Sequence, residues 1–184
     1  MKTILLTAVL AGSTLWSFGQ GTVNFANGAA GVDAPVHRAD GTTFVVGPLF
    51  VAQLYGGANG TPVNSLSPMG TPVQFELPGP DSGYFFGAQT TVTNVPGGSI
   101  ATLVVRVWST VNGATYEAAS TVNGAEVGTS LPINVTLATP PATPPSMVGL
   151  QSFNLSIVSI VPEPSAIILG GLGAIAVLLR RRKG

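Results

Sequence analysis

The stretch that decides the fold lies just past the middle of the chain and reads Ser99-Ile100-Ala101-Thr102-Leu103-Val104-Val105-Arg106-Val107-Trp108. Apolar and β-branched residues fill it almost without interruption, which is typical of a strand covered on both faces. Pro96-Gly97-Gly98 before it and Asn112-Gly113 after it are turn signals. We therefore predict a central strand with Trp108 in the core, followed by an Asn-Gly hairpin turn and a returning antiparallel strand over residues 115–121.

Shorter runs on both sides of this strand alternate apolar and polar residues and are separated by clusters of glycine, proline and asparagine. Further strands are predicted over residues 22–26, 42–46, 49–55, 71–77, 84–95, 131–137 and 153–160. Pro72 favours an edge position for its strand, because proline has no N–H to give to a neighbour. About eight or nine strands without a helix between them indicate an all-β fold. We predict one antiparallel β-sandwich of jelly-roll or Greek-key type over residues 20–160.

The composition of this segment excludes several classes of function. Its net charge is −4, because Arg38 and Arg106 stand against six acids: Asp33, Asp40, Glu76, Asp81, Glu117 and Glu126. Such a domain lacks the basic surface that nucleic-acid binding requires. The absence of cysteine from the sequence excludes disulfides, thiolate metal sites and cysteine nucleophiles. No phosphate loop or dinucleotide fingerprint occurs, and we expect no cofactor.

The first residues have the pattern of an export signal. Met1-Lys2 gives a short positive region, and residues 3–18 are mostly apolar. Ser17 and Gly19 are small residues at positions −3 and −1 of a cleavage site before Gln20. We predict a signal peptide over residues 1–19.

Residues 161–184 combine three parts. Val161-Pro162-Glu163-Pro164 is followed by an apolar run over residues 165–179, and then by four basic residues, Arg180, Arg181, Arg182 and Lys183. A helix of roughly 15 residues is about 22 Å long, which is short for a bilayer core of about 30 Å. The basic side chains lengthen it by reaching to the lipid head groups. We predict a transmembrane helix with its basic end in the cytoplasm and residues 20–160 on the outer side.

This tail resembles the PEP-CTERM sorting signal of exported bacterial proteins. Pro162, Glu163 and Pro164 match its tripeptide, residues 165–179 its transmembrane part, and Arg180 to Lys183 its basic end. The resemblance implies membrane lipid and an exosortase as partners, with this chain as the substrate processed near the tripeptide. The domains that precede this signal are diverse, so the resemblance says little about residues 20–160.

The densest polar cluster lies between Val32 and Gly41 and contains His37, the single histidine of the chain. One interpretation is a metal site in which Asp33, Asp40 and backbone carbonyls hold calcium, although the regular spacing of a calcium loop is missing. The alternative is a solvated loop closed by a turn at Asp40-Gly41.

Three consecutive aromatic residues, Tyr84, Phe85 and Phe86, must place at least one ring on the face opposite to the others. Because aromatic rings on a strand usually fill the core, we expect a core role for part of this group. Tyr84 and Phe86 are the candidates for a surface that binds a ligand, with sugars as the expected class.

Three hypotheses follow for the whole chain. The first is an exported envelope or matrix protein without catalytic activity, anchored in the membrane, processed, and delivered to the cell surface or the extracellular matrix. The second is a carbohydrate-binding module of the exopolysaccharide that uses the same route. The third is a small hydrolase with acids around His37, for which the sequence has no nucleophile elbow.

Overall fold

The computed structural model describes residues 19–160 of the chain. The predicted signal peptide, apart from Gly19, and the predicted transmembrane helix lie outside the described residues. Seven longer strands form the main structure: β1 Gln20–Ala26, β5 Phe50–Ala58, β6 Ser67–Gln74, β7 Phe86–Pro96, β8 Ile100–Ser109, β9 Glu126–Thr129 and β10 Ile133–Thr136. Five two-residue strands complete it: β2 Gly28–Ala29, β3 Val32–Asp33, β4 Val36–His37, β11 Phe153–Asn154 and β12 Ser156–Ile157. Two short helical turns are η1 Val63–Ser65 and α1 Tyr116–Ala119. The prediction of an all-β fold is confirmed.

Strand β8 lies in the middle of the largest sheet, as its composition predicts. The order is β12-β9-β8-β5-β6, and β10 also pairs with β8. β5 and β8 are antiparallel neighbours from Phe50 opposite Ser109 to Ala58 opposite Ala101. β6, which contains Pro72, is the edge strand that this proline predicts. Most of β8 is buried on both faces, and Trp108 is fully buried.

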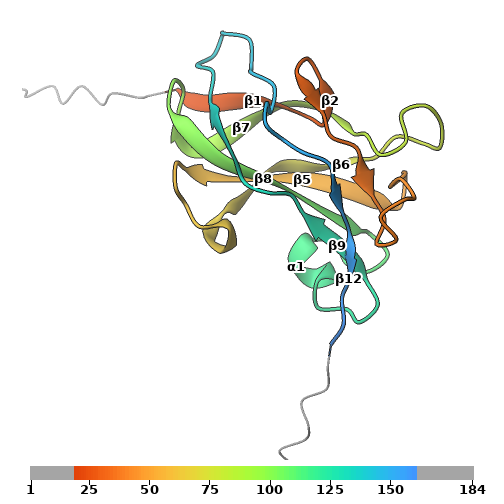
Figure 1. Ribbon diagram of the computed structural model, residues 1–184. Helices are drawn as coiled ribbons and strands as arrows, with labels where there is room; N and C mark the ends of the chain where they lie inside the picture. Colours follow the sequence, from red (N-terminus) through yellow and green to blue (C-terminus); the bar gives the residue numbers. More distant parts are fainter. Residues whose placement is uncertain (1–18, 161–184) are drawn as a thin grey trace, which may run out of the picture.

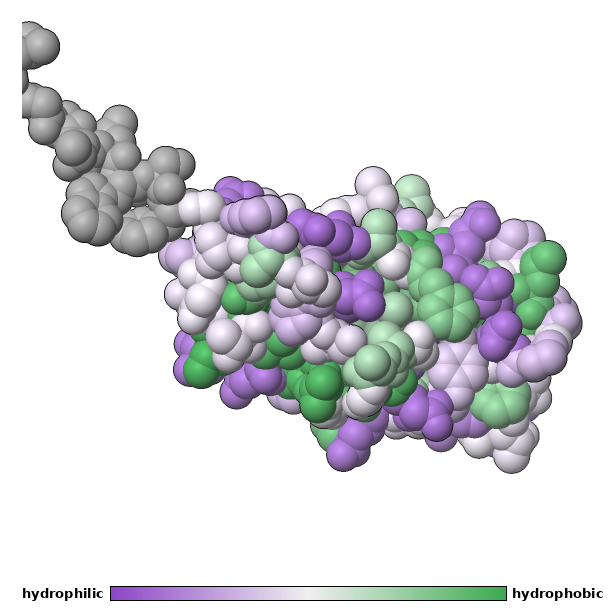
Figure 2. Space-filling model, turned by 90° about the horizontal axis from the view of Figure 1, so that it is seen from above, coloured by the Kyte–Doolittle hydropathy of each residue, from purple (hydrophilic) through white to green (hydrophobic). Residues whose placement is uncertain are grey.

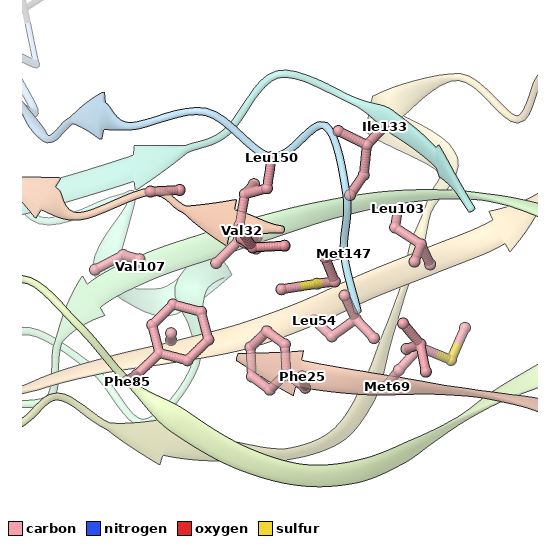
Figure 3. Packing of buried hydrophobic residues seen from close by; sticks show 14 of the residues in the cluster. Phe25, Val32, Leu54, Met69, Phe85, Leu103, Val107, Ile133, Met147 and Leu150 are labelled. Carbon is pink, nitrogen blue, oxygen red and sulfur yellow. The ribbon is translucent and has the colours of Figure 1, made fainter. Parts of the chain in front are cut away.

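A second antiparallel layer, β1 paired with β7, covers one face of this sheet. In Figure 1 these two strands lie over β8 and β5, while β9, β12 and α1 lie at the lower end. The core between the layers holds Phe25 from β1, Val92 from β7, Leu54 from β5 and Leu103 from β8. Figure 3 shows Phe25 and Phe85 facing Leu54 and Met147 in this core. Closely packed apolar side chains of this kind supply the main stabilising term of the fold.

The predicted return strand over residues 115–121 is wrong. The chain forms the helical turn α1 there, and the Thr115 hydroxyl accepts a hydrogen bond from the Ala118 N–H at 3.2 Å, which caps the turn. The strand that pairs with β8 on this side is β9, with Trp108 opposite Val127. The reason is that Trp108 donates from Nε1 to the Gly113 carbonyl at 3.1 Å, which draws the chain back over this face of the sheet.

Two other predicted strands are also changed. Residues 42–46 make only an isolated bridge between Phe44 and His37, because the segment turns at Asp40. Residues 153–160 divide at the buried Leu155 into two short strands. β11 runs parallel to β4, and β12 then joins β9 antiparallel at the edge of the large sheet. The expectation of purely antiparallel pairing is therefore wrong for β4 and β11.

Candidate functional site

Tyr84 and Phe86 lie next to each other where β7 begins: Phe86 is its first residue and Tyr84 precedes it by two, with Phe85 between them in the core. Phe85 is fully buried and contacts Phe25 and Phe75 at ring centroid distances of 4.8 Å and 5.4 Å. The rings of Tyr84 and Phe86 are nearly parallel, with an angle of 12° between their planes and 6.4 Å between their centroids. Phe86 is 48% exposed. The structure thus brings the two predicted aromatic residues together at the surface.

The loop before these rings is fixed by the buried side chain of Asn27. Its amide nitrogen donates to the carbonyls of Ala34 at 2.8 Å and Gly83 at 2.9 Å, and its amide oxygen accepts from the Phe85 N–H at 2.7 Å. A buried amide with these partners is satisfied and holds three segments in one arrangement. Asn27 therefore positions the aromatic pair. In the sequence, the only indication of this role is that Asn27 is the one polar residue in the run Phe25-Ala26-Asn27-Gly28.

Gly28 and Asp33 complete this corner of the surface. A Cβ atom at position 28 would lie 2.9 Å from Tyr84 Cδ1 and 3.1 Å from Phe86 Cε1, so both rings pack closely against this glycine. The Tyr84 hydroxyl donates to Asp33 Oδ1 at 2.5 Å, and this hydrogen bond raises the pKa of Tyr84. Two parallel rings beside a carboxylate are groups that stack on and hydrogen-bond to a sugar.

Asp40, the second candidate metal ligand, is used within its own turn. Its carboxylate accepts from the Thr43 hydroxyl at 2.5 Å and from the N–H groups of Thr42 and Thr43 at 2.9 Å and 2.8 Å. The Thr43 hydroxyl above all, together with these two N–H groups, lowers the pKa of Asp40 to about 2. The turn at Asp40-Gly41 that the sequence predicts is present, with Gly41 at a φ of 73°. Asp33 and Asp40 thus serve two separate hydrogen-bonded groups.

Two of the four remaining acids of this segment form ion pairs at separate places. Glu117 binds Arg106 Nη1 at 3.1 Å, and Glu126 binds Arg38 Nε at 2.5 Å. The His37 ring lies against the ring of Phe44, with 4.7 Å between centroids. Among residues 19–160, no group of three or more histidine, cysteine, aspartate or glutamate side chains is placed to hold a metal ion.

A cavity that sequence reasoning missed lies at the end of the large sheet where β5 begins at Phe50 and β8 ends at Ser109. It has a volume of about 440 Å³, and its lining includes Arg38, Phe50, Val111, Glu126 and Ile157. The Arg38 guanidinium sits 4.9 Å from the centre of the Phe50 ring. These residues come from five separate segments of the chain, so no local sequence motif could predict the cavity.

The chain leaves the domain beside this cavity. The Gly124 N–H donates to the Val158 carbonyl, and the Val158 N–H donates to the Ala125 carbonyl, both at 2.8 Å. The Ile160 N–H then donates to Asn123 Oδ1 at 3.1 Å. The chain is therefore fixed to the domain up to Ile160, one residue before the predicted sorting signal.

The comparisons with known proteins support the resemblance of the tail. Residues 161–183 match the family model of the PEP-CTERM protein-sorting motif. This range includes the predicted tripeptide from Pro162 to Pro164 and the basic cluster from Arg180 to Lys183, all outside the described residues. No curated protein and no solved structure matches the chain. Within residues 19–160, no helix has the length and apolar character required to cross a membrane. The chain carries a signal for export and membrane-associated sorting, with an exosortase as the implied processing partner.

Proposed function

We propose that this chain is an exported cell-envelope or matrix protein without catalytic activity of its own. Its C-terminal helix holds it in the membrane, and an exosortase then cleaves near Pro162-Glu163-Pro164, so that the domain reaches the cell surface or the exopolysaccharide. The match of residues 161–183 to the sorting motif is the observation that carries this proposal. We interpret residues 20–160 as a β-sandwich of jelly-roll or Greek-key type, an interpretation supported by the two facing layers.

The way the chain leaves the domain supports processing at the tripeptide. Within residues 19–160, the last hydrogen bond along the chain to the domain is made by Ile160, and Pro162 follows two residues later in the sequence. Cleavage near Pro162 would therefore release the domain without cutting any strand of the core.

Mass spectrometry of released protein from a host with an exosortase tests this route. We expect a C-terminus between Val161 and Pro164. A chain with Glu163→Gln and Pro164→Ala should remain in the membrane fraction at full length. Glu76→Gln, a change of the same carboxylate inside the domain, should leave processing unchanged. Released material that still ends in Lys183-Gly184 would refute the proposal.

Carbohydrate binding is the second candidate, and the parallel rings of Tyr84 and Phe86 favour it. A sugar ring that stacks on an aromatic face buries its apolar C–H groups, and a nearby carboxylate accepts hydrogen bonds from its hydroxyls. The proposal is that Tyr84 and Phe86 contact the sugar and that Asp33 orients Tyr84.

Retention on immobilised exopolysaccharide of the host tests this second function. Phe86→Ala and Tyr84→Ala should each reduce retention, and Tyr84→Phe should reduce it less because the ring remains. Phe44→Ala is the matched control, since Phe44 is 41% exposed but lies outside the pair. Equal retention of all variants, or none of the unaltered protein, would exclude sugar binding at this pair.

A further inference from the structure

The end of the domain where the chain leaves carries a group of exposed aliphatic side chains, which we call the exit surface: Leu49, Val111, Val122, Ile157 and Ile160. Leu49, Val111 and Ile157 line the same cavity. Val122 and Ile160 adjoin it, because Ile160 is hydrogen-bonded to Asn123. Val111 is 73% exposed and Ile157 61% exposed. Figure 2 views the molecule from above, away from the lower end of Figure 1 where β9 and β12 lie, and on that upper face apolar side chains are interspersed with polar ones. Grouped exposed aliphatic residues mark a surface that another phase or molecule covers.

The charges at the exit surface differ from those of the domain as a whole. Residues 20–160 carry a net charge of −4, but the charged residues that line the cavity are Arg38 and Glu126, which neutralise each other. Arg38 donates a hydrogen bond from Nε to Glu126 Oε2, and its two terminal nitrogens make no hydrogen bond to residues 19–160. Its side chain is 40% exposed. An arginine with free terminal N–H groups at an aliphatic rim is suited to bind phosphate oxygens.

The length of chain after Ile160 limits how far this surface can be from lipid. The apolar run begins at Ser165, five residues later. Five residues span at most about 18 Å when fully extended, and the head-group layer on one side of a bilayer takes up about 5–8 Å of that. A tether of this length gives the exit surface a high effective concentration at the membrane, so a weak surface affinity is sufficient.

We propose that the exit surface rests on the outer head-group layer of the bilayer while the chain is anchored. The aliphatic side chains enter the interface, and Arg38 contacts lipid phosphates. This inference rests on the proposed membrane route. It assigns to residues far from the sorting signal a role in orienting the domain before processing, with Pro162 held at the membrane surface where a membrane enzyme can reach it.

Because the sequence contains no cysteine, single labels can report on this contact. Val111→Cys places an environment-sensitive fluorophore on the exit surface of the full chain, reconstituted in vesicles of phosphatidylethanolamine and phosphatidylglycerol. Ile100→Cys is the matched control, since Ile100 is 45% exposed at the opposite end of β8, about 30 Å away along the strand. We expect a blue shift and quenching by spin-labelled lipid at position 111 and neither at position 100.

A second set of variants separates lipid contact from simple proximity. Leu49→Ser combined with Ile157→Ser should abolish the blue shift at position 111 while the chain still floats with the vesicles. Arg38→Gln should reduce the additional quenching that phosphatidylglycerol gives over phosphatidylethanolamine alone. These side chains are at least partly exposed, and the tryptophan emission of the variants reports whether the fold is kept.

The possible failures are distinguishable. If the unaltered chain does not float with the vesicles, the membrane route itself is wrong and this inference falls with it. If the chain floats and the label at position 111 stays in a water-like environment, the route stands and the inference is overturned. A shift at position 111 that requires added exosortase would also overturn it, because the exit surface would then contact a protein.

Discussion

Strand β8 buries one face in an aliphatic core and the other beneath a layer of aromatic and charged side chains. Toward β1 and β7 it directs Ala101, Leu103, Val105 and Val107, all in the main apolar cluster. The opposite face, formed by Val104, Arg106 and Trp108, is covered by η1 and α1. One strand therefore takes part in two kinds of packing, and the alternation of side chains along it separates them.

The second face is organised around Arg106. Its guanidinium lies 4.2 Å from the centre of the Tyr55 ring and 4.9 Å from that of Tyr116. It donates from Nη1 to Glu117 at 3.1 Å and from Nη2 to the Val63 carbonyl at 3.1 Å. A charge in a buried strand requires partners of this kind. The aliphatic face thus depends on filled volume, whereas the other face depends on polar partners that the two short helical turns bring to Arg106.

The largest effect is expected from a cavity on the aliphatic face. Leu103 is fully buried and packs against Gly56, so Leu103→Ala should lower the free energy of unfolding by about 3 kcal/mol. Urea unfolding followed by Trp108 fluorescence measures it. Leu131→Ala is the control, since Leu131 is 68% exposed, and it should change stability by less than about 0.5 kcal/mol. Equal effects of the two substitutions would show that this face is not the main core.

The stability contributed by the second face should depend on pH, whereas the stability contributed by the aliphatic face should not. Burial, and then the hydrogen bond that Tyr55 donates to Glu117 at 2.9 Å, raise the pKa of Tyr55 from 10.0 to about 12. Because the pKa is higher in the folded state, the contribution of Tyr55 is complete below pH 10 and is lost as the pH rises toward 12. We expect a loss of about 2 kcal/mol across this window.

Unfolding experiments between pH 9 and pH 12 check this dependence. Tyr55→Phe should flatten the slope, while Leu103→Ala should lower stability at every pH without changing the slope. A slope that is unchanged in Tyr55→Phe would mean that Tyr55 ionises equally easily in the folded and unfolded chains.

The aliphatic face could be predicted from the sequence, and most of the other face could not. The composition of residues 99–108 is that of a strand buried on both sides, which gives both the central position of β8 and the burial of Trp108. The helical turn α1 has four residues, too few for a helical period to emerge. The single charged residue in this buried run, Arg106, indicates that the second face must supply a polar partner. The sequence does not indicate which of the six acids is that partner.

The candidate sites divide in the same way. Alternation around Phe85 predicts that Tyr84 and Phe86 share a face, because neighbours two apart on a strand point the same way. Their contact with Asp33 joins residues 51 positions apart, and their approach to Gly28 depends on the fold around Asn27. The exit surface depends on pairings between β9, β12 and the end of β8, which local patterns do not reveal.

The smallest effect is expected from removing the charge of Arg106 while keeping its volume. Its Nε atom is buried without a hydrogen-bond partner among residues 19–160, and Glu117, whose side chain is 59% exposed, can be hydrated once the arginine is gone. Because Glu117 is largely exposed, the ion pair itself contributes only about 0–1 kcal/mol, and a methionine side chain keeps most of the arginine's volume between the rings. Arg106→Met should therefore change the free energy of unfolding by less than about 1 kcal/mol, as measured by urea unfolding at neutral pH.

Arg106→Ala is the matched comparison, because it removes the charge and also the methylene groups that pack between Tyr55 and Tyr116. It should cost about 2 kcal/mol, clearly more than Arg106→Met. If the two variants lose the same stability, the charge and its hydrogen bonds hold α1 over the sheet. If Arg106→Met is nearly neutral, the second face follows the same volume rule as the first, and the polar partners serve only to make one arginine tolerable in the strand.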